Sequence, residues 1–247
     1  VDKMIIKNPL AMKCAFGENP KRCYGQGAKK SPMTRMAVAA LLRELLFKTK
    51  RYMEDKENGK NPAFDMKLEA MIPVLKGEIP LKAHAHRADD ILTAIRVAKE
   101  FGVKITLDHC TEGAIIAEEL AEEGLSAFVG PSLGSKSKIE LRNKSFTTPA
   151  ALAQAGVPIS IITDAPVIPL QYLPMCAGLA VKSGLDYEEG WRAITINPAV
   201  QTGIGDRVGS LEPGKDGDIV IWTDDPMTVL GAESAVTIID GKIVYEA

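Results

Sequence analysis

Three histidines and one aspartate, each at the end of a short apolar stretch, are the residues of this chain best suited to chemistry. His84 and His86 end the stretch Ile-Pro-Leu-Lys-Ala-His-Ala-His, and His109 ends Ile-Thr-Leu-Asp-His; the sequence has three histidines in all. Asp164 ends a third stretch, Ile-Ser-Ile-Ile-Thr-Asp. Imidazole and carboxylate groups suit Zn²⁺ or a similar first-row divalent ion. A carboxylate beside such an ion can also take a proton from water.

The His-x-His pair also has a simpler interpretation. Strand residues alternate between faces, so His84 and His86 share one face. An isolated pair of this kind is more often a polar strand end that contacts backbone or solvent. His109 and Asp164 at later strand ends favour the metal site, because barrel enzymes collect catalytic residues from the carboxyl ends of several parallel strands.

Two further charged residues, Glu18 and Arg87, have alternative interpretations. Glu18 follows a glycine at an earlier strand end, where a solvated loop acid is the better interpretation and a further metal ligand is the other. Arg87 follows the histidine strand directly and could hold a substrate carboxylate by a bidentate contact. It could equally pair with Asp89 or Asp90 on the next helix, and the sequence does not decide between these alternatives.

Other reactive side chains have weaker support. Lys13 and Lys82 at strand positions could be ligands if carbamylated, but a surface lysine that extends its amine to solvent is the simpler interpretation. Cys110 beside His109 is expected to pack rather than to react. The serines of loop 131–136 lack a histidine partner, so a serine nucleophile is weakly supported.

The elements that must position these side chains alternate between strand and helix. Strands are predicted at 80–85, 103–108, 126–129 and 158–163, mostly with helices between them. Their spacing is close to the roughly 30 residues of a βα unit, which predicts an α/β fold with a parallel sheet. Upstream, the sequence predicts a short strand within 9–25, a loop to about Lys30, a long helix from Ser31-Pro32 to about Asp55, and a second helix over 64–76.

The last part of the chain has a different pattern. Strands are predicted at 218–222, 235–239 and 242–245, and Asp240-Gly241 is a hairpin turn signal. These features predict a partial barrel over 1–205 and a portion of a small β-sandwich over 206–247. Counting gives about five barrel strands where an eight-stranded (β/α)8 barrel needs three more, so the missing strands are expected upstream of Val1.

The composition argues against nucleic-acid binding and membrane association. The formal net charge of -2 gives no electrostatic case for nucleic acid or a membrane surface, and no apolar run is long enough to span a bilayer. The four cysteines are scattered without a C-x-x-C pair, which indicates neither a zinc knuckle nor a disulfide framework. A cytoplasmic protein is the default expectation.

The sequence resembles the amidohydrolase superfamily, in particular the metal-dependent hydrolases related to imidazolonepropionase. The resemblance depends on Lys-Ala-His-Ala-His at 82–86, Leu-Asp-His at 107–109, Thr-Asp-Ala-Pro at 163–166, Ile-Asn-Pro-Ala at 196–199, and Gly-Ser-Leu-Glu-Pro-Gly-Lys-Asp-Gly-Asp-Ile-Val at 209–220. It is strong over about 79–247 and weaker over 9–25, through Gly-Glu-Asn-Pro at 17–20.

The resemblance implies a role for each candidate residue. His84 and His109 would be metal ligands, and Asp164 would be both a ligand and a catalytic proton shuttle. Glu18 would occupy the position of a further ligand that some members have, and His86 would belong to the second shell or contact substrate. The implied cofactor is a divalent metal, most simply Zn²⁺ as one or two ions. The implied reaction is attack of a metal-activated water on a carbon–nitrogen bond of a small-molecule amide or cyclic amide.

One departure leaves other hypotheses open. The first-strand His-x-His of the family is absent, and no spare histidine could supply it. We expect that motif upstream of Val1; the alternative is a non-catalytic barrel fragment without a complete metal site. A third hypothesis is a metal-free lyase with a Schiff base on Lys82. The substrate is undefined, and a homo-oligomer is left open.

Overall fold

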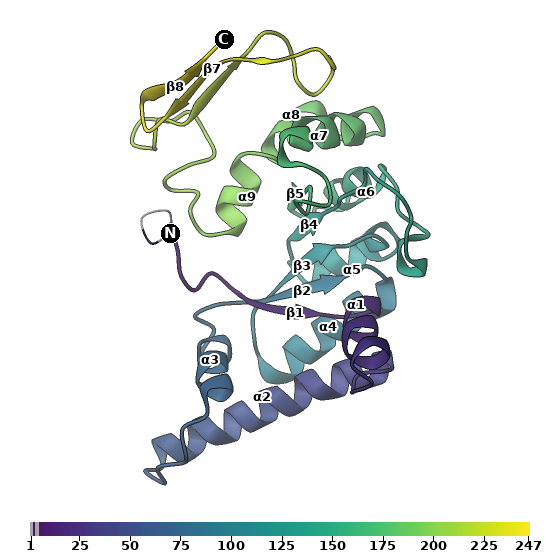
Figure 1. Cartoon of the computed structure of the whole chain (residues 1–247), viewed down its shortest axis with the longest axis vertical. Coiled ribbons are helices and arrows are strands. Elements are labelled where there is room, and N and C mark those ends of the chain that lie inside the picture. Colours follow the sequence, from purple (N-terminus) through teal and green to yellow (C-terminus); the bar gives the residue numbers. More distant parts are fainter. Residues whose placement is uncertain (1, 3–4) are drawn as a thin grey trace. The chain divides into compact units, whose positions relative to one another are not determined.

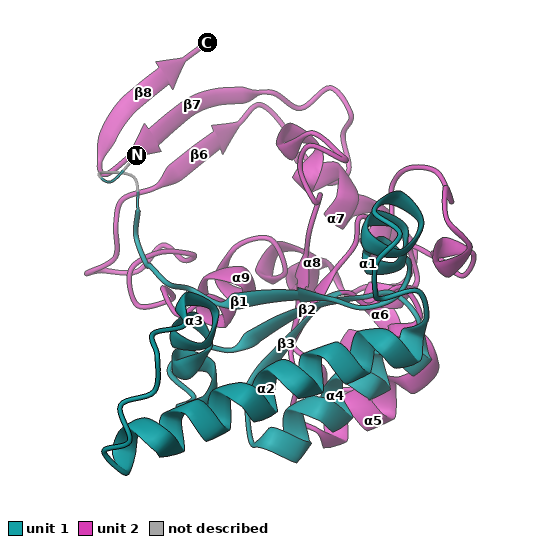
Figure 2. Cartoon of the chain, turned by 60° about the horizontal axis from the view of Figure 1, so that its bottom comes forward, with its two compact units in different colours: residues 1–108 teal, residues 109–247 magenta. Residues whose placement is uncertain are grey.

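The computed structural model describes Asp2 and residues 5–247, in two compact units that meet inside one strand. Unit 1 ends at Asp108 and unit 2 begins at His109, as coloured in Figure 2. The main sheet has five parallel strands in the order β1-β2-β3-β4-β5, and a separate antiparallel sheet has the order β6-β7-β8. The α/β fold with a parallel sheet is therefore confirmed, while the closed eight-stranded barrel and the domain division at 205/206 stay predictions.

Unit 1 contains three strands covered by helices (Figure 1). In chain order its elements are β1 (Met12–Ala15), α1 (Glu18–Pro20), η2 (Lys21–Gly27), α2 (Arg35–Glu57), α3 (Met66–Leu75), β2 (Leu81–Ala85), α4 (Ala88–Phe101) and β3 (Ile105–His109). Apolar side chains from α2, α3, α4 and β2 form one buried cluster, which includes Leu46, Val74, Leu81 and Val97. This cluster fixes one face of the sheet and leaves the other face to polar side chains.

Alternation along β2 sorts its side chains between the two faces. Leu81, Ala83 and Ala85 are fully buried, as expected for residues packed beneath helices. The intervening Lys82 and His84 therefore project from the opposite face. Helix α4 follows after Arg87 and is capped after Phe101 by Gly102, whose φ of 65° lies in the left-handed region that favours glycine.

Two sequence predictions in unit 1 are wrong in detail. Helix α2 begins at Arg35 rather than at Ser31-Pro32, because the Thr34 side chain accepts a hydrogen bond from the Ala37 amide and caps the helix there. Residues 21–27, expected to be a glycine-rich loop, form the π-helical turn η2.

Unit 2 continues the strand–helix order and ends in the small sheet. Its elements are η3 (Gly113–Ile116), α5 (Ala117–Glu122), β4 (Ala127–Val129), η4 (Ile139–Leu141), α6 (Thr148–Gln154), β5 (Ile159–Ile161), η5 (Leu170–Tyr172), α7 (Leu173–Lys182), α8 (Tyr187–Arg192), α9 (Ile196–Gln201), β6 (Ile219–Trp222), β7 (Ser234–Ile239) and β8 (Lys242–Glu246). The short β4 and β5 are fully buried, as central strands of a covered parallel sheet are. Among the described helices, none has the length and apolar character needed to cross a membrane.

Candidate metal centre

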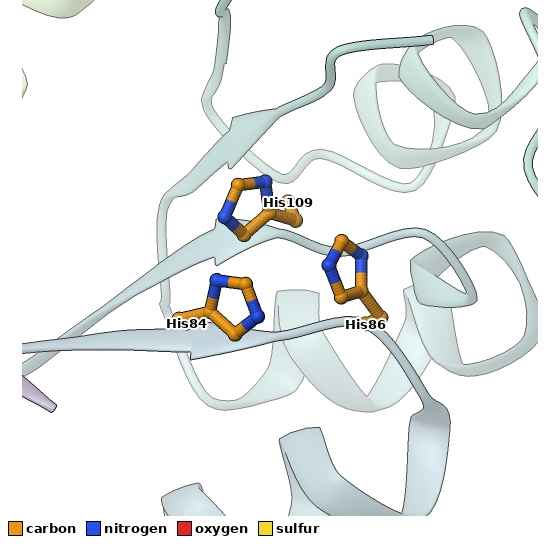
Figure 3. Close-up of side chains that lie close together, drawn as sticks. All are labelled: His84, His86 and His109. Carbon is orange, nitrogen blue, oxygen red and sulfur yellow. The ribbon is translucent and has the colours of Figure 1, made fainter. Parts of the chain in front are cut away.

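The three histidines lie together at the carboxyl ends of β2 and β3 (Figure 3). One potential ligand atom from each of His84, His86 and His109 lies within 4.8 Å of the others. All three side chains are buried, with exposed fractions of 4–7%. The rings of His84 and His86 are 4.8 Å apart between centroids and perpendicular to each other. The cluster thus contains every histidine of the sequence, on two consecutive strands.

The backbone and one hydrogen bond define the state of His109. Its φ is +77° and that of the following Cys110 is +46°, so both leave the strand through a conformation that non-glycine residues rarely adopt. Nδ1 of His109 lies 2.7 Å from the carbonyl oxygen of Gly130, at the end of β4. A carbonyl only accepts, so Nδ1 carries a proton and donates it to this bond. In the neutral ring the lone pair is then on Nε2, the form in which histidine binds metals.

The loop after β1 contacts His84. The side-chain amide of Asn19 donates to Nε2 of His84 at 3.1 Å. Gly17, with a φ of +78°, turns the chain out of β1 and into the helical segment that carries Glu18 and Asn19. Glu18 is half-buried beside Asn19. The weak sequence resemblance at 17–20 therefore marks a segment that does contact the histidine cluster.

A row of charged side chains lies on the polar face of β1, β2 and β3. Nζ of Lys13 on β1 and Nζ of Lys82 on β2 lie 2.5 and 2.6 Å from the two carboxylate oxygens of Asp108 on β3. Burial opposes ionisation of Asp108, but the two lysine hydrogen bonds outweigh it and hold the pKa of this carboxyl below its usual range. Both lysines are engaged in ion pairs, which differs from the solvent-directed interpretation made from the sequence. Asp108 itself was not singled out there, although its position next to His109 was visible.

The remaining predicted residues lie outside the histidine cluster. Among the described residues, the group of potential ligands contains neither Glu18 nor Asp164. Asp164 is exposed in the turn after β5, with a φ of +51°, and its carbonyl accepts from the Val167 amide at 2.9 Å. Arg87 makes a bidentate ion pair with Asp89, which is one of the two alternatives the sequence left open. Cys110 is fully buried, as expected of a packing residue.

Comparison with known protein families shows to which family the chain belongs. The Amidohydrolase family profile matches residues 69–244, well over half of the sequence, including both histidine strands and the Asp164 turn. The chain belongs to the amidohydrolase family. The resemblance inferred from short motifs is confirmed.

Individual relatives support this assignment. The crystal structure of an amidohydrolase from Thermotoga maritima is 41% identical, with a TM-score of 0.95 over all of this chain and 65% of that chain. Amidohydrolase tasK of Hapsidospora irregularis is 25% identical over 95% of this chain and 26% of its own length. An imidazolonepropionase of Thermoplasma volcanium is 34% identical over 42% of this chain and 28% of its own length. The chain thus spans about a quarter of these two curated relatives and about two thirds of the solved structure.

Proposed function

We propose that this chain provides the metal-binding strand ends of a hydrolase that cleaves the carbon–nitrogen bond of an amide or cyclic amide. One observation carries the proposal: three buried imidazoles, with ligand atoms within 4.8 Å of one another, end two consecutive strands of an amidohydrolase. Three imidazoles gathered this closely form a donor set that a shared divalent cation suits.

The donor set fits a first-row divalent ion. Imidazole nitrogen suits Zn²⁺ and its neighbours, and the hydrogen bond from Nδ1 of His109 to Gly130 places the lone pair of the neutral ring on Nε2. We propose His84, His86 and His109 as the residues that would hold the ion, with Glu18 as a further candidate ligand. When bound, the ion supplies positive charge that polarises a carbonyl group and lowers the pKa of water. Zn²⁺ is the simplest choice, as one or two ions.

The chain's own carboxylates would move the protons. We propose that Asp164 takes a proton from the attacking water on a carboxylate oxygen and passes it to the leaving nitrogen, and that Asp164 can also contact the metal. Its place in the turn after β5 supports this role, because βα loops at strand ends carry catalytic residues in such folds. Arg87 stays a proposed substrate contact, and it would have to release Asp89 to act as one.

Metal binding can be tested without an activity assay. Since the sequence has three histidines, all in the cluster, long-range ¹H–¹⁵N NMR of imidazole nitrogens reports on this site alone. We expect a stoichiometric amount of Zn²⁺ to shift the signals of all three rings, and His109→Ala to weaken binding by more than about tenfold. Unmoved imidazole signals at saturating Zn²⁺ would refute the metal site and favour the non-catalytic alternative.

Hydrolysis is the second test. A panel of small amides and cyclic amides is assayed with the metal-loaded protein, after chelation, and after Zn²⁺ is restored. We expect activity to disappear with the chelator and to return with the ion, and Asp164→Asn to abolish turnover while metal stays bound. Activity indifferent to chelation would contradict the proposal, as would borohydride trapping of a carbonyl substrate on Lys82.

A further inference from the structure

A pocket beside the histidine cluster is lined by one face of a short helical segment. Asn19, Arg22, Cys23, Gln26 and Gly27 surround a volume of about 490 Å³. Their spacing of three and four residues places them along one side of the segment formed by α1 and η2. Neither element was recognised in the sequence, so this face was not considered there.

The pocket adjoins the candidate metal centre through Asn19. Asn19, which lines the pocket, also donates from its side-chain amide to Nε2 of His84. Arg22 follows three residues later in the same helical segment and lines the same pocket. An amide substrate whose reacting carbon lies at His84 could therefore place a group a few bonds away within reach of the Arg22 guanidinium.

The opposite side of the segment is anchored. Gly25 is buried, and a methyl group there would lie 2.7 Å from the carbonyl oxygen of Pro32. The Lys30 amide donates to the Tyr24 carbonyl at 2.8 Å, which ties the end of the turn back onto itself. The pocket face is thus held in a fixed direction, as a recognition surface needs to be.

The charged residues around the segment formed by α1 and η2 favour an anionic ligand. Residues 18–34 contain four basic residues, Lys21, Arg22, Lys29 and Lys30, and one acid, Glu18. The Arg22 side chain is exposed, and it makes no ion pair with any residue that the structure describes. Arginine presents a planar fork of donors that matches a carboxylate bidentately. Gln26, one turn further along, adds a side-chain amide that can donate to the same group.

We propose that Arg22 is a specificity residue that binds a substrate carboxylate, so that the preferred substrates are amides with a carboxylate a few bonds from the scissile carbon, such as N-acyl amino acids. This inference rests on the proposed hydrolase function for its consequence in catalysis. The binding of the carboxylate itself does not depend on metal or turnover. The two can therefore be tested separately.

The thiol of Cys23 provides a binding test. Cys23 is the exposed cysteine of the chain and lines the pocket; Cys110 and Cys176 are buried, and burial raises the pKa of the Cys14 thiol to about 12. Iodoacetamide should therefore alkylate Cys23 first, which peptide mass spectrometry can verify. We expect N-acetylglycine to slow this alkylation saturably, and N-acetylglycinamide, which lacks the carboxylate, to have no such effect at the same concentrations.

Variants assign the effect to Arg22. Arg22→Gln should weaken the protection by about tenfold or more, the loss expected when a hydrogen bond to a charged group is removed. Lys21→Gln removes the adjacent positive charge, which is not part of the pocket lining. In this variant N-acetylglycine should protect Cys23 as well as it does in the natural sequence. Equal protection by the acid and the carboxamide, or full protection in Arg22→Gln, would overturn the proposal.

Turnover separates this inference from the proposed function. If the metal-loaded protein hydrolyses amides, kcat/KM for the carboxylate substrate relative to its carboxamide should fall by about tenfold or more in Arg22→Gln and stay constant in Lys21→Gln. Hydrolysis without any preference for the carboxylate overturns the inference and leaves the hydrolase function standing. Carboxylate-specific protection of Cys23 in a protein that hydrolyses no amide supports carboxylate binding by Arg22 and contradicts the hydrolase function.

Discussion

Nδ1 of His109 lies 2.7 Å from the carbonyl oxygen of Gly130, so the end of β4 determines which nitrogen of His109 carries the proton. Gly130 has a φ of +128°, and a methyl group there would lie 2.5 Å from the carbonyl oxygen of Ile162. This position therefore requires glycine for two reasons: its backbone angle, and the lack of room for a side chain.

Gly130→Ala should lower the free energy of unfolding by at least about 2 kcal/mol and weaken Zn²⁺ binding, because the carbonyl that holds His109 must move. Urea unfolding and the imidazole NMR titration measure the two effects. Gly124→Ala is the matched control, since Gly124 also has a positive φ of +63° but nothing within 4 Å of an added methyl group. It should cost about 1 kcal/mol and leave Zn²⁺ affinity unchanged. Equal losses in both variants would show that the Gly130 contact is unimportant.

The two lysines that share Asp108 should contribute unequally to stability. Asp108→Ala leaves two ammonium groups facing each other and should cost about 3 kcal/mol. Lys82→Ala should cost more than Lys13→Ala, because the Lys82 side chain is 30% exposed and the Lys13 side chain 57%. Urea unfolding of the three variants is the measurement, and a larger loss for Lys13→Ala would contradict the burial argument.

The Glu69 carboxylate predicts a pH dependence of stability. Hydrogen bonds from Lys56 and Tyr52, each 2.6 Å long, hold the pKa of Glu69 below its ordinary value of 4.5. A lowered pKa in the folded state means that this stabilisation is complete above the unfolded value and is lost as the pH falls through the folded value. The difference in unfolding midpoint between the natural sequence and Glu69→Gln should therefore be constant near neutral pH and shrink below about pH 4.5. Glu54→Gln, which removes an exposed carboxylate from α2, provides the comparison. A difference that grows on acidification would have the wrong sign.

Gly178 in α7 is the position where unit 2 should be least tolerant of a side chain. A methyl group there would lie 1.8 Å from the carbonyl oxygen of Met227, a backbone atom that cannot move aside cheaply. Gly178→Ala should cost about 2 kcal/mol or more by thermal or urea unfolding. Gly231→Ala, with nothing within 4 Å, should change the free energy of unfolding by less than about 0.5 kcal/mol. Similar values for the two would mean that α7 and the Met227 segment can separate without loss.

Local patterns predicted the strands well and the start of α2 and the helical turn η2 less well. Predicted strands at 80–85 and 103–108 match β2 and β3 because short apolar runs that end in a polar group are typical of buried parallel strands. The start of α2 was misplaced because the Thr34 side chain, rather than Ser31, caps the helix. The turn η2 was missed since its two glycines favour a loop by propensity.

For the candidate site, the sequence singled out the three histidines but not the contacts around them. His84 and His109 were expected as ligands, and the structure adds His86 to the same cluster. The row of Lys13, Lys82 and Asp108 could not be predicted, because it depends on the register between three strands far apart in the sequence. The roles of Glu18 and Asp164 remain proposals.

The strands of the main sheet lie in the same order as they leave the ribosome. Each strand therefore pairs with the strand that precedes it in the sequence. Two long helices, α2 and α3, are synthesised between β1 and β2, whereas the single helix α4 separates β2 from β3. Shorter loops close at lower entropic cost, so β2, α4 and β3 should assemble before β1 is captured. All three histidines lie at the ends of those two strands. The three imidazoles of the proposed metal site would therefore come together early, and the Gly130 carbonyl that orients His109 would join them once β4 emerges.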